Sequence, residues 1–456
     1  MSFDFIGWLM NPYVLMFVAV FTGLLFGKIK FGKFNFGVSG TLFTGLILGW
    51  LAMGYAKQFG ESDTAFKSAS KLISAGVIPK EFFTIFLILF VAAVGLLAAK
   101  DMAVVLKKYG VKFIILGVLI TAVGAAATYG MTFVSSGSNP YEVSGVYTGA
   151  LTSSPGLAAA IETAQAHSTE AVAEYDTLSD EKKAKMLDRL DKTGALTPEN
   201  TPSLSAEQQK QYITNAQAGI GVGHAIGYPF GVLIVIIAVN FLPKMFRINV
   251  EEEHKAFKLE MEEAKNGHGA REIPEASFDL IAFAIACFFG YTLGMIKIKM
   301  GFLGDFSLGA TGGVLIGSLI LGYIGKIGPV TFRMNSKILG VVRQLSLAFF
   351  LGVVGLRYGF KVFDALLGDG WLLAVVALVV GFVAMTVGFI VGHYIFKINW
   401  IMLSGAICGG MTSTPGLGAA IDAVDSDDPA AGYGATYPFA LLGMVIFTII
   451  LHKLPM

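Results

Sequence analysis

The sequence predicts an all-α protein that crosses a lipid bilayer many times. Of its 456 residues, 55% are hydrophobic and only 14% are charged, and apolar runs of about 20 residues, long enough to span a bilayer, recur from end to end. Soluble globular proteins carry roughly 25% charged residues, so this chain lacks the polar surface of a water-soluble fold. The runs are also too long and too uniformly apolar for the alternating strands of a membrane β-barrel.

Each apolar run is expected to be a helix, because a helix satisfies its own backbone hydrogen bonds inside lipid. The first run has no basic residue before it and Lys28, Lys30 and Lys33 after it, so we expect a span and not a cleaved signal peptide. The expected spans lie near 6–27, 36–54, 82–99, 113–134, 217–242, 277–296, 306–325, 338–356, 371–396 and 431–451.

Several classes of function find no support in the sequence. The net charge of +1 provides no basic surface for nucleic acid. The only cysteines, Cys287 and Cys408, lie in expected spans, so neither a disulfide framework nor a thiolate metal site is predicted. No phosphate-binding loop, zinc motif or nucleophile–base pair is recognisable. We therefore expect no enzyme, no metal site, no catalytic residue and no cofactor.

The chain contains an internal repeat. Residues 144–162 and 404–422 are identical at 11 of 19 positions, at an offset of 260. We infer that two halves arose from one duplicated unit. The further matches are Phe90, Gly95 and Leu96 with Phe350, Gly355 and Leu356, Gly37, Gly40 and Gly45 with Gly309, Gly312 and Gly317, and Tyr228-Pro229-Phe230 with Tyr437-Pro438-Phe439.

The repeat divides the chain into three parts. The first membrane repeat covers residues 1–242 and contains a polar insertion at about 163–216, which we expect to form a small helical cap with a helix start at Ser205. A charged cytoplasmic linker follows at 243–276, where "EEEHKAFKLEMEEAK" predicts a surface helix. The second membrane repeat covers 277–456.

The distribution of basic residues indicates the orientation of the repeats. If the repeated element dips into the membrane and returns, each half has five spans, and the loops inside hold more Lys and Arg when the N-terminus lies outside. If the element crosses fully, the counts do not discriminate. An odd number of spans inverts one repeat relative to the other, as is common in secondary transporters. We therefore expect two inverted repeats, with the N-terminus outside.

The repeated element, "TSSPGL" in the first half and "TSTPGL" in the second, predicts a broken helix. Pro155 and Pro415 break a helix interior but suit a first helical turn. Ser154 and Thr414 precede them and are expected to cap a new helix. A helix that starts inside the membrane exposes backbone N–H groups and the positive end of its dipole, which attract anions. The alternative is a pair of proline kinks used for packing.

These features define the candidate binding residues. Hydroxyl and glycine residues at the two breaks would surround a small anion between two half-helix N-termini, and Tyr228 and Tyr437 would line the same cavity or fix their own helix kinks. Arg343 lies about five residues into a span, so its cation either reaches the headgroups or binds a ligand carboxylate. The break residues concerned are Thr152, Ser153, Ser154, Pro155 and Gly156, with Thr412, Ser413, Thr414, Pro415 and Gly416.

At these residues the chain resembles the aspartate:alanine exchanger family of bacterial secondary transporters. "GALTSSPGLAAA" with "GHAIGYPFGV", and "GGMTSTPGLGAA" with "GYGATYPFAL", are similar to that family's paired signature. The resemblance implies an antiporter-like fold with inverted five-helix repeats, a homodimer, and a transport domain that moves against a scaffold. It also implies a multi-pass protein of the inner membrane of a prokaryotic cell. Two departures are the short central linker, where the family carries soluble regulatory domains, and the insertion in the first half.

Three functions remain open at this point. The favoured one is exchange, or ion-coupled transport, of small carboxylates such as aspartate and alanine. The second is sodium-coupled symport, or cation/proton antiport, on the same fold; a sodium ion or a proton would then be the coupling ion. The third is an anion channel.

Overall fold

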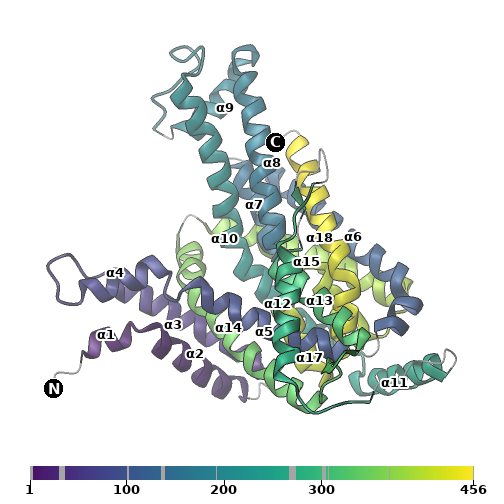
Figure 1. Cartoon of the computed structure of the whole chain (residues 1–456). Coiled ribbons are helices and arrows are strands. Elements are labelled where there is room, and N and C mark those ends of the chain that lie inside the picture. Colours follow the sequence, from purple (N-terminus) through teal and green to yellow (C-terminus); the bar gives the residue numbers. More distant parts are fainter. Residues whose placement is uncertain are drawn as a thin grey trace.

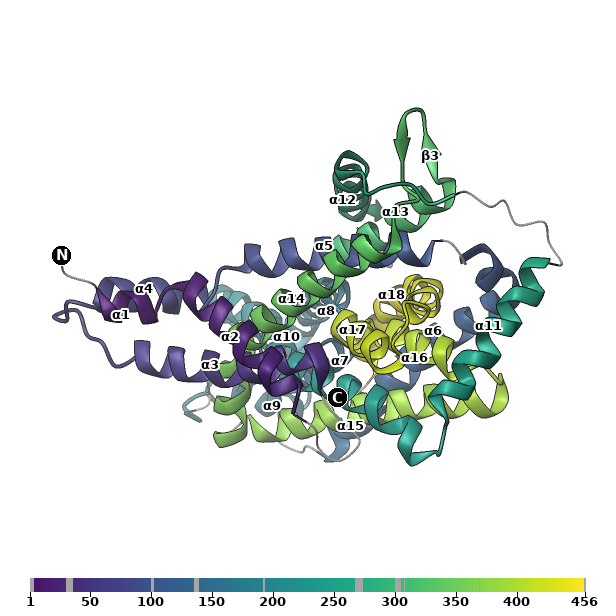
Figure 2. The same cartoon turned by 90° about the horizontal axis from the view of Figure 1, so that it is seen from below.

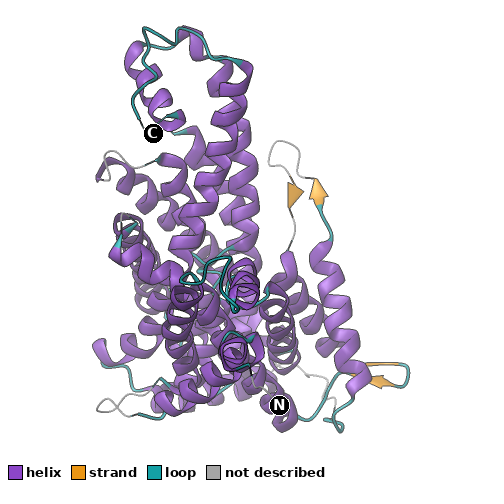
Figure 3. Ribbon diagram, turned by 90° about the vertical axis from the view of Figure 1, so that its left-hand side faces the viewer, coloured by secondary structure: helices purple, strands orange, loops and turns teal. Residues whose placement is uncertain are grey.

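The structure is a computed structural model and is built almost entirely of helices (Figure 1). It describes residues 4–29, 36–99, 102–134, 139–191, 193–266, 274–299, 305–306, 308–368 and 370–454. The strands described are two short antiparallel pairs, β1 (Ile298–Lys299) with β2 (Asp305–Phe306) and β3 (Lys326–Ile327) with β4 (Val330–Thr331), seen in Figure 3. The chain is therefore an all-α polytopic membrane protein, as the composition predicts.

The first half follows the expected order of helices. Its elements are α1 (Phe5–Leu9), α2 (Pro12–Gly27), η1 (Gly37–Ser39), α3 (Gly40–Ala56), α4 (Phe66–Ala75), α5 (Lys80–Ala98), α6 (Met102–Val134), α7 (Pro140–Ala150), α8 (Ser154–Ala173), η2 (Tyr175–Thr177), α9 (Asp180–Leu190) and α10 (Ala206–Met245).

The second half repeats that order after the linker helix α11 (Val250–Asn266). Its helices are α12 (Leu280–Met295), α13 (Gly309–Ile324), α14 (Ser336–Leu367), α15 (Trp371–Ile390), the π-helical turn η4 (Val391–Ile395), α16 (Trp400–Gly410), α17 (Thr414–Val424) and α18 (Pro429–Lys453).

All ten predicted spans are helical, and one is shorter than expected. In the described residues seven helices are long and apolar enough to cross a membrane, and α2, α12 and α13 are apolar helices of 16 residues. The first span begins at Pro12 and not near residue 6, because Asn11 caps a new helix there and its side chain accepts a hydrogen bond from the Tyr13 amide at 2.9 Å.

The predicted polar elements outside the spans also form. The amphipathic stretch of the insertion is α9, and α10 begins at Ser205 with a capping box that includes Gln208. The insertion has its own apolar core, which includes Tyr175, Leu187 and Tyr212. Figure 1 places α9 at one end of the molecule and α11 at the other.

Helix packing follows the sequence repeat. α3 of the first half packs closely on α14 of the second, since an added Cβ on Gly45 would lie 2.7 Å from the Gly352 carbonyl oxygen. α5 of the first half packs closely on α13 of the second, since an added Cβ on Gly95 would lie 2.7 Å from Ser318 Cβ and 3.0 Å from the Leu315 carbonyl oxygen. Because α3 corresponds to α13 and α5 to α14, the two contacts are equivalent in the repeat. The matched Gly37 and Gly309 also share a positive φ, +51° and +66°.

The membrane helices pack mainly within two groups (Figure 2). One group contains α2, α3, α5, α12, α13 and α14. The other contains α6, α7, α8, α10, α15, α16, α17 and α18. Each group takes corresponding helices from both halves, and the broken helices all belong to the second group.

Candidate functional site

Both repeated elements are breaks between two helices. In the first half α7 ends at Ala150, and α8 begins at Ser154. Between them Thr152 has a φ of +54°. In the second half α16 ends at Gly410, α17 begins at Thr414, and the intervening Thr412 has a φ of +47°. A positive φ is unfavourable for a β-branched residue, and such strain is concentrated at functional sites.

The two breaks lie against each other. The Thr152 hydroxyl donates a hydrogen bond to the Met411 carbonyl oxygen at 3.2 Å, and the Thr412 hydroxyl donates to the Leu151 carbonyl oxygen. Each strained threonine thus satisfies the carbonyl that precedes the other one. Thr152 is 6% exposed and Thr412 is 4% exposed, so the crossing is buried inside the protein and no lipid separates the two breaks.

The helix caps lie one residue earlier than the sequence indicated. Ser153 and not Ser154 caps α8, and its Oγ accepts a hydrogen bond from the Gly156 amide at 3.1 Å. Ser413 and not Thr414 caps α17, with the corresponding bond from Gly416 at 3.2 Å. The proline therefore occupies the second helical position, where its missing N–H also costs no intrahelical hydrogen bond.

The caps reduce the number of amides that a ligand would find. At α17 the Ser413 amide donates to the Cys408 carbonyl oxygen at 2.8 Å, Pro415 has no N–H, and the Gly416 amide donates to Ser413. Within the described residues the Thr414 amide has no acceptor. A single backbone donor, and not a full turn of them, thus remains at this N-terminus.

A small cavity lies beside the crossing. Its volume is about 40 Å³, which is room for a few water molecules, since one water needs roughly 10–15 Å³ by this measure. It lies between the two helix groups, because the breaks, α10 and α18 line one side, while α5, α13 and α14 line the other. The lining residues are Phe83, Leu87, Thr152, Tyr228, Thr311, Phe350, Thr412, Thr414 and Tyr437.

Hydroxyl groups dominate the polar part of this cavity. Four threonines and two tyrosines line it, and the lining residues described include no Asp, Glu, Lys, Arg or His. Tyr228 stacks on Tyr358 with ring centroids 4.9 Å apart. Tyr437 stacks on Tyr433 at 5.1 Å, and the Tyr433 hydroxyl lies 3.2 Å from the Thr414 hydroxyl. Because the Thr152 and Thr412 hydroxyls already donate to backbone carbonyls, the cavity offers a ligand the hydroxyls of Thr311, Thr414, Tyr228 and Tyr437 and two helix ends.

Comparison with known families now identifies the chain. The model of a family described as a predicted permease membrane region matches residues 15–177 and again residues 282–453. The two matched segments fall on the two halves of the structure and together cover most of the chain. The chain belongs to the aspartate–alanine exchanger family. It is therefore a membrane protein of a transporter and permease family, in agreement with the resemblance inferred from the paired signature.

Several relatives of this exchanger-family chain are named as uncharacterized transporters. It is 38% identical to an uncharacterized transporter of Bacteroides thetaiotaomicron over 181 residues. This matched length is 40% of this chain and 34% of the relative. It is 38% identical over 185 residues to one of Bacteroides fragilis, again 40% and 34%. It is 30% identical over 194 residues to one of Desulfotalea psychrophila, which is 42% and 36%. The matched part thus spans about a third of each relative.

The structure brings five of the predicted site residues to the cavity: Thr152, Thr412, Thr414, Tyr228 and Tyr437. Ser153 and Ser413 lie directly behind as caps, and Pro415 is buried in the first turn of α17. The side chains of Ser154 and Pro155 lie outside the described part of the chain. An added Cβ on Gly416 would lie 2.3 Å from Val235 Cγ1, so this glycine permits close packing on α10.

Arg343 does not line the cavity of this exchanger-family chain. Its guanidinium forms an ion pair with Asp427, in the connection between α17 and α18. The side chains of Arg343 and Asp427 are 15% and 35% exposed. Nearby, Asp422 accepts a hydrogen bond from the Val38 amide at 3.2 Å. In this conformation the charge of Arg343 is therefore paired with a carboxylate of the protein and not with a ligand.

Sequence reasoning missed four lining residues: Phe83, Leu87, Thr311 and Phe350. A signal existed for Thr311. It lies within the glycine-matched segment, and at the same offset it stands over Ser39, a buried hydroxyl residue. Hydroxyls that recur at matched positions of both halves would have selected it. Phe83 and Leu87 lie in uniformly apolar sequence and carry no such signal.

Proposed function

We propose that the protein is a secondary transporter of small carboxylates, by preference amino acids such as aspartate and alanine. It exchanges them across the inner membrane of a prokaryotic cell, with its N-terminus outside and two copies forming a homodimer. Its chemistry is binding and movement of a solute, and it is not an enzyme. Support comes from the family, whose name refers to aspartate–alanine exchange, and from the geometry of the crossing.

The observation that carries this proposal is the reciprocal contact of the two breaks through Thr152 and Thr412. It brings the N-termini of α8 and α17 to one buried place. A helix N-terminus stabilises a negative charge by up to about 2 kcal/mol in a partly buried position. Hydroxyls and one free amide supply hydrogen bonds. A carboxylate is therefore the ligand that this place stabilises best.

The position of the cavity supports alternating access of the elevator type. The cavity lies at the seam between the group that holds the breaks and the group that holds α5, α13 and α14. Its volume of about 40 Å³ is far below the roughly 300 Å³ of ordinary ligand sites. Movement of one group against the other would open the seam and admit the solute. In this conformation the central cavity is then closed around too small a volume to hold the solute.

Counterflow in proteoliposomes tests the proposal. Vesicles preloaded with unlabelled aspartate should accumulate labelled aspartate or alanine, and empty vesicles should not. Ser413→Leu should abolish this flux, because leucine cannot cap α17 and intrudes into the buried crossing. Ser62→Leu, on an exposed loop, is the matched control and should transport normally. Normal counterflow in both variants would remove the basis of the proposed site.

Sodium dependence of uptake and electrical recording separate the alternatives. Sodium-coupled symport remains a candidate because threonine hydroxyls and freed carbonyls can hold sodium without a charged side chain, so uptake is measured with and without sodium. Cation/proton antiport is less supported, since the cavity lining contains no carboxylate. Ohmic single-channel currents, in place of saturable flux stimulated from the opposite side, would indicate an anion channel.

A further inference from the structure

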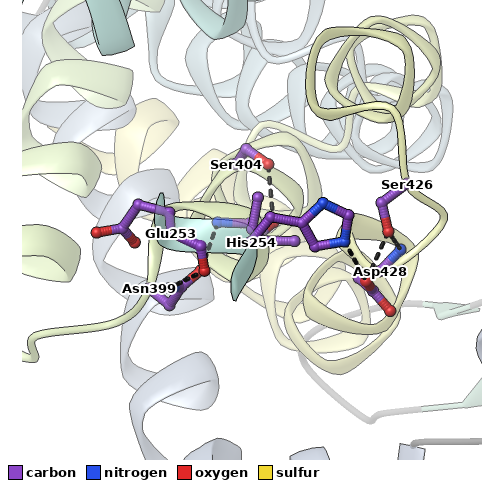
Figure 4. Close-up of polar contacts among 7 residues, drawn as sticks. Glu253, His254, Asn399, Ser404, Ser426 and Asp428 are labelled. Carbon is purple, nitrogen blue, oxygen red and sulfur yellow. Dashed lines mark hydrogen bonds and ion pairs between the residues drawn. The ribbon is translucent and has the colours of Figure 1, made fainter. Parts of the chain in front are cut away.

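The first turn of the linker helix α11 is fastened to the N-terminus of α16 and to the connection that leads into α18. The Glu253 carboxylate accepts a hydrogen bond from the Trp400 amide at 2.7 Å, and the Glu253 carbonyl oxygen accepts one from the Asn399 side chain at 2.8 Å. His254 Nε2 lies 3.7 Å from Asp428 Oδ2, at the start of α18. Figure 4 shows the contacts of Glu253 with Asn399 and of His254 with Asp428.

The same helix is fastened to α6 two turns further on. Glu260 pairs with Lys108 at 2.5 Å and accepts a hydrogen bond from the Tyr109 hydroxyl. Lys112, one turn along α6, donates to the Phe396 carbonyl oxygen at 2.9 Å, just after η4. The linker therefore bridges α6 and the N-terminus of α16, and an open cavity lies between these segments and the end of η4.

That space is a second cavity of about 290 Å³. This volume is near the lower end of ordinary small-molecule sites, about 300 Å³, and several times that of the central cavity. Its lining is polar and carries both signs of charge. The lining residues are Glu253, Glu260, His393, Lys397, Ile398 and Asn399.

The charged groups of this cavity are only partly used by the protein. In the contacts described, Glu253 uses Oε2 and Glu260 uses Oε1, so each carboxylate keeps one oxygen. Lys397 has neither an ion pair nor a hydrogen bond among the described residues, and its backbone has a φ of +51°. His393 stacks on Phe389 at 5.3 Å, and no described hydrogen bond engages its ring nitrogens.

We propose that this cavity binds a small zwitterionic α-amino acid. The ammonium group is held by the free oxygens of Glu253 and Glu260 on α11. The carboxylate is held by Lys397 and His393 at η4. A simple anion would face two carboxylates, and a simple cation would face Lys397, whereas a zwitterion uses all four groups. Charge-assisted hydrogen bonds of this kind are the strong ones.

Such a ligand would bridge the linker helix and the segment that leads into α16. Occupation would therefore hold the N-terminus of α16, the helix that ends at the second break, and regulate its movement. This site is separate from the central cavity, since the two share no lining residue. The proposal does not depend on which solute is transported.

Hydrogen–deuterium exchange of the full-length chain in lipid nanodiscs tests the proposal with three probes. L-Alanine carries both charges, propionate lacks the ammonium group, and ethylamine lacks the carboxylate. Alanine should slow amide exchange at least threefold in peptides covering 250–266 and 391–401. Propionate and ethylamine should leave these peptides unchanged. Equal protection by propionate or by ethylamine would overturn the zwitterion assignment.

Lys397→Gln separates this cavity from the central one. The variant should lose the alanine protection at 250–266 and keep any response of peptides around Thr152. Lys258→Gln, an exposed position on α11 outside the cavity lining, is the matched control and should respond like the unaltered chain. Unchanged protection of 250–266 in Lys397→Gln would overturn the site, whatever the outcome of transport assays.

Discussion

Thr152 and Thr412 form a reciprocal pair at the centre of the protein. Each has a positive φ, and each hydroxyl donates to the carbonyl oxygen of the residue before the other. Because the two residues come from matched positions of the repeats, one local conformation is used twice and each copy stabilises the other. The strain of the two backbones is therefore offset by contacts that neither half could make alone.

The first prediction concerns these hydroxyls. Thr412→Val keeps the side-chain shape and removes the donor, so the buried Leu151 carbonyl oxygen loses its partner. We expect a loss of about 1–3 kcal/mol in the free energy of unfolding, measured by denaturant unfolding in detergent micelles. Thr412→Ser retains the hydroxyl and should stay close to the unaltered chain.

Thr412→Gly then separates backbone strain from the lost hydrogen bond. Glycine lacks the hydroxyl but adopts a positive φ without the cost of roughly 1–2 kcal/mol that other residues have there. We expect Thr412→Gly to be more stable than Thr412→Val. The opposite order would contradict the interpretation that the backbone at Thr412 is strained.

The second prediction concerns the helix caps. Ser153→Ala and Ser413→Ala remove the acceptors of the Gly156 and Gly416 amides. Each should lower the free energy of unfolding by about 1 kcal/mol. Ser413→Thr retains a capping hydroxyl and serves as the control. If Ser413→Ala has no effect while Thr414→Ala destabilises α17, the cap lies one residue later than the structure places it.

The third prediction concerns the ion pair of Arg343 with Asp427. Exposed pairs contribute about 0–1 kcal/mol, and loss of one partner of a buried pair costs about 3–5 kcal/mol. Because these side chains are 15% and 35% exposed, we expect Asp427→Asn to cost an intermediate amount, about 2 kcal/mol. Arg343→Gln in the Asp427→Asn background should then add little, which a double-mutant cycle measures. Full additivity would show that Arg343 has another partner.

The sequence was sufficient for the spans, the repeat and the breaks, for physical reasons. In lipid, a long apolar run satisfies its backbone hydrogen bonds only as a helix. A proline after two hydroxyl residues ends one helix and permits another to begin. The cap was misplaced by one residue because proline is tolerated at either of the first two helical positions, and only the bond from Gly156 to Ser153 distinguishes them.

The composition of the cavity was only partly predictable, because it depends on packing between the halves. Phe83 and Phe350 lie with ring centroids 5.1 Å apart, and each stands beside a second phenylalanine in the sequence. The repeat matches Phe350 with Phe90 and not with Phe83, so neither the repeat nor periodicity predicts this contact. Arg343 has a related difficulty, since its partner Asp427 lies 84 positions later in a loop, and a buried cation alone does not reveal whether protein or ligand neutralises it.

The fourth prediction concerns the pH dependence of the stability of the helical cap formed by the polar insertion (163–216). This cap contains His167 and lies outside the membrane spans. Burial lowers the pKa of His167 below its usual 6.5, and Arg189 contributes in the same direction while Glu170 opposes it. The ring also contacts the Tyr141 hydroxyl at 3.1 Å and lies 6.3 Å from the His452 ring. Because the unfolded state binds the proton more readily, the cap should lose stability as the pH falls below about 6.5.

Amide exchange in α9 and the end of α8 measures this effect. After correction for intrinsic rates, exchange should be faster at about pH 5.5 than at about pH 7.5, the range in which histidine titrates. His167→Gln keeps a polar side chain that does not titrate and should flatten the dependence. Glu170→Gln removes the one described charge that favours the protonated ring, so the destabilisation at low pH should increase. If His167→Gln retains the full pH dependence, another group of the cap is responsible, and burial of His167 has no part in it.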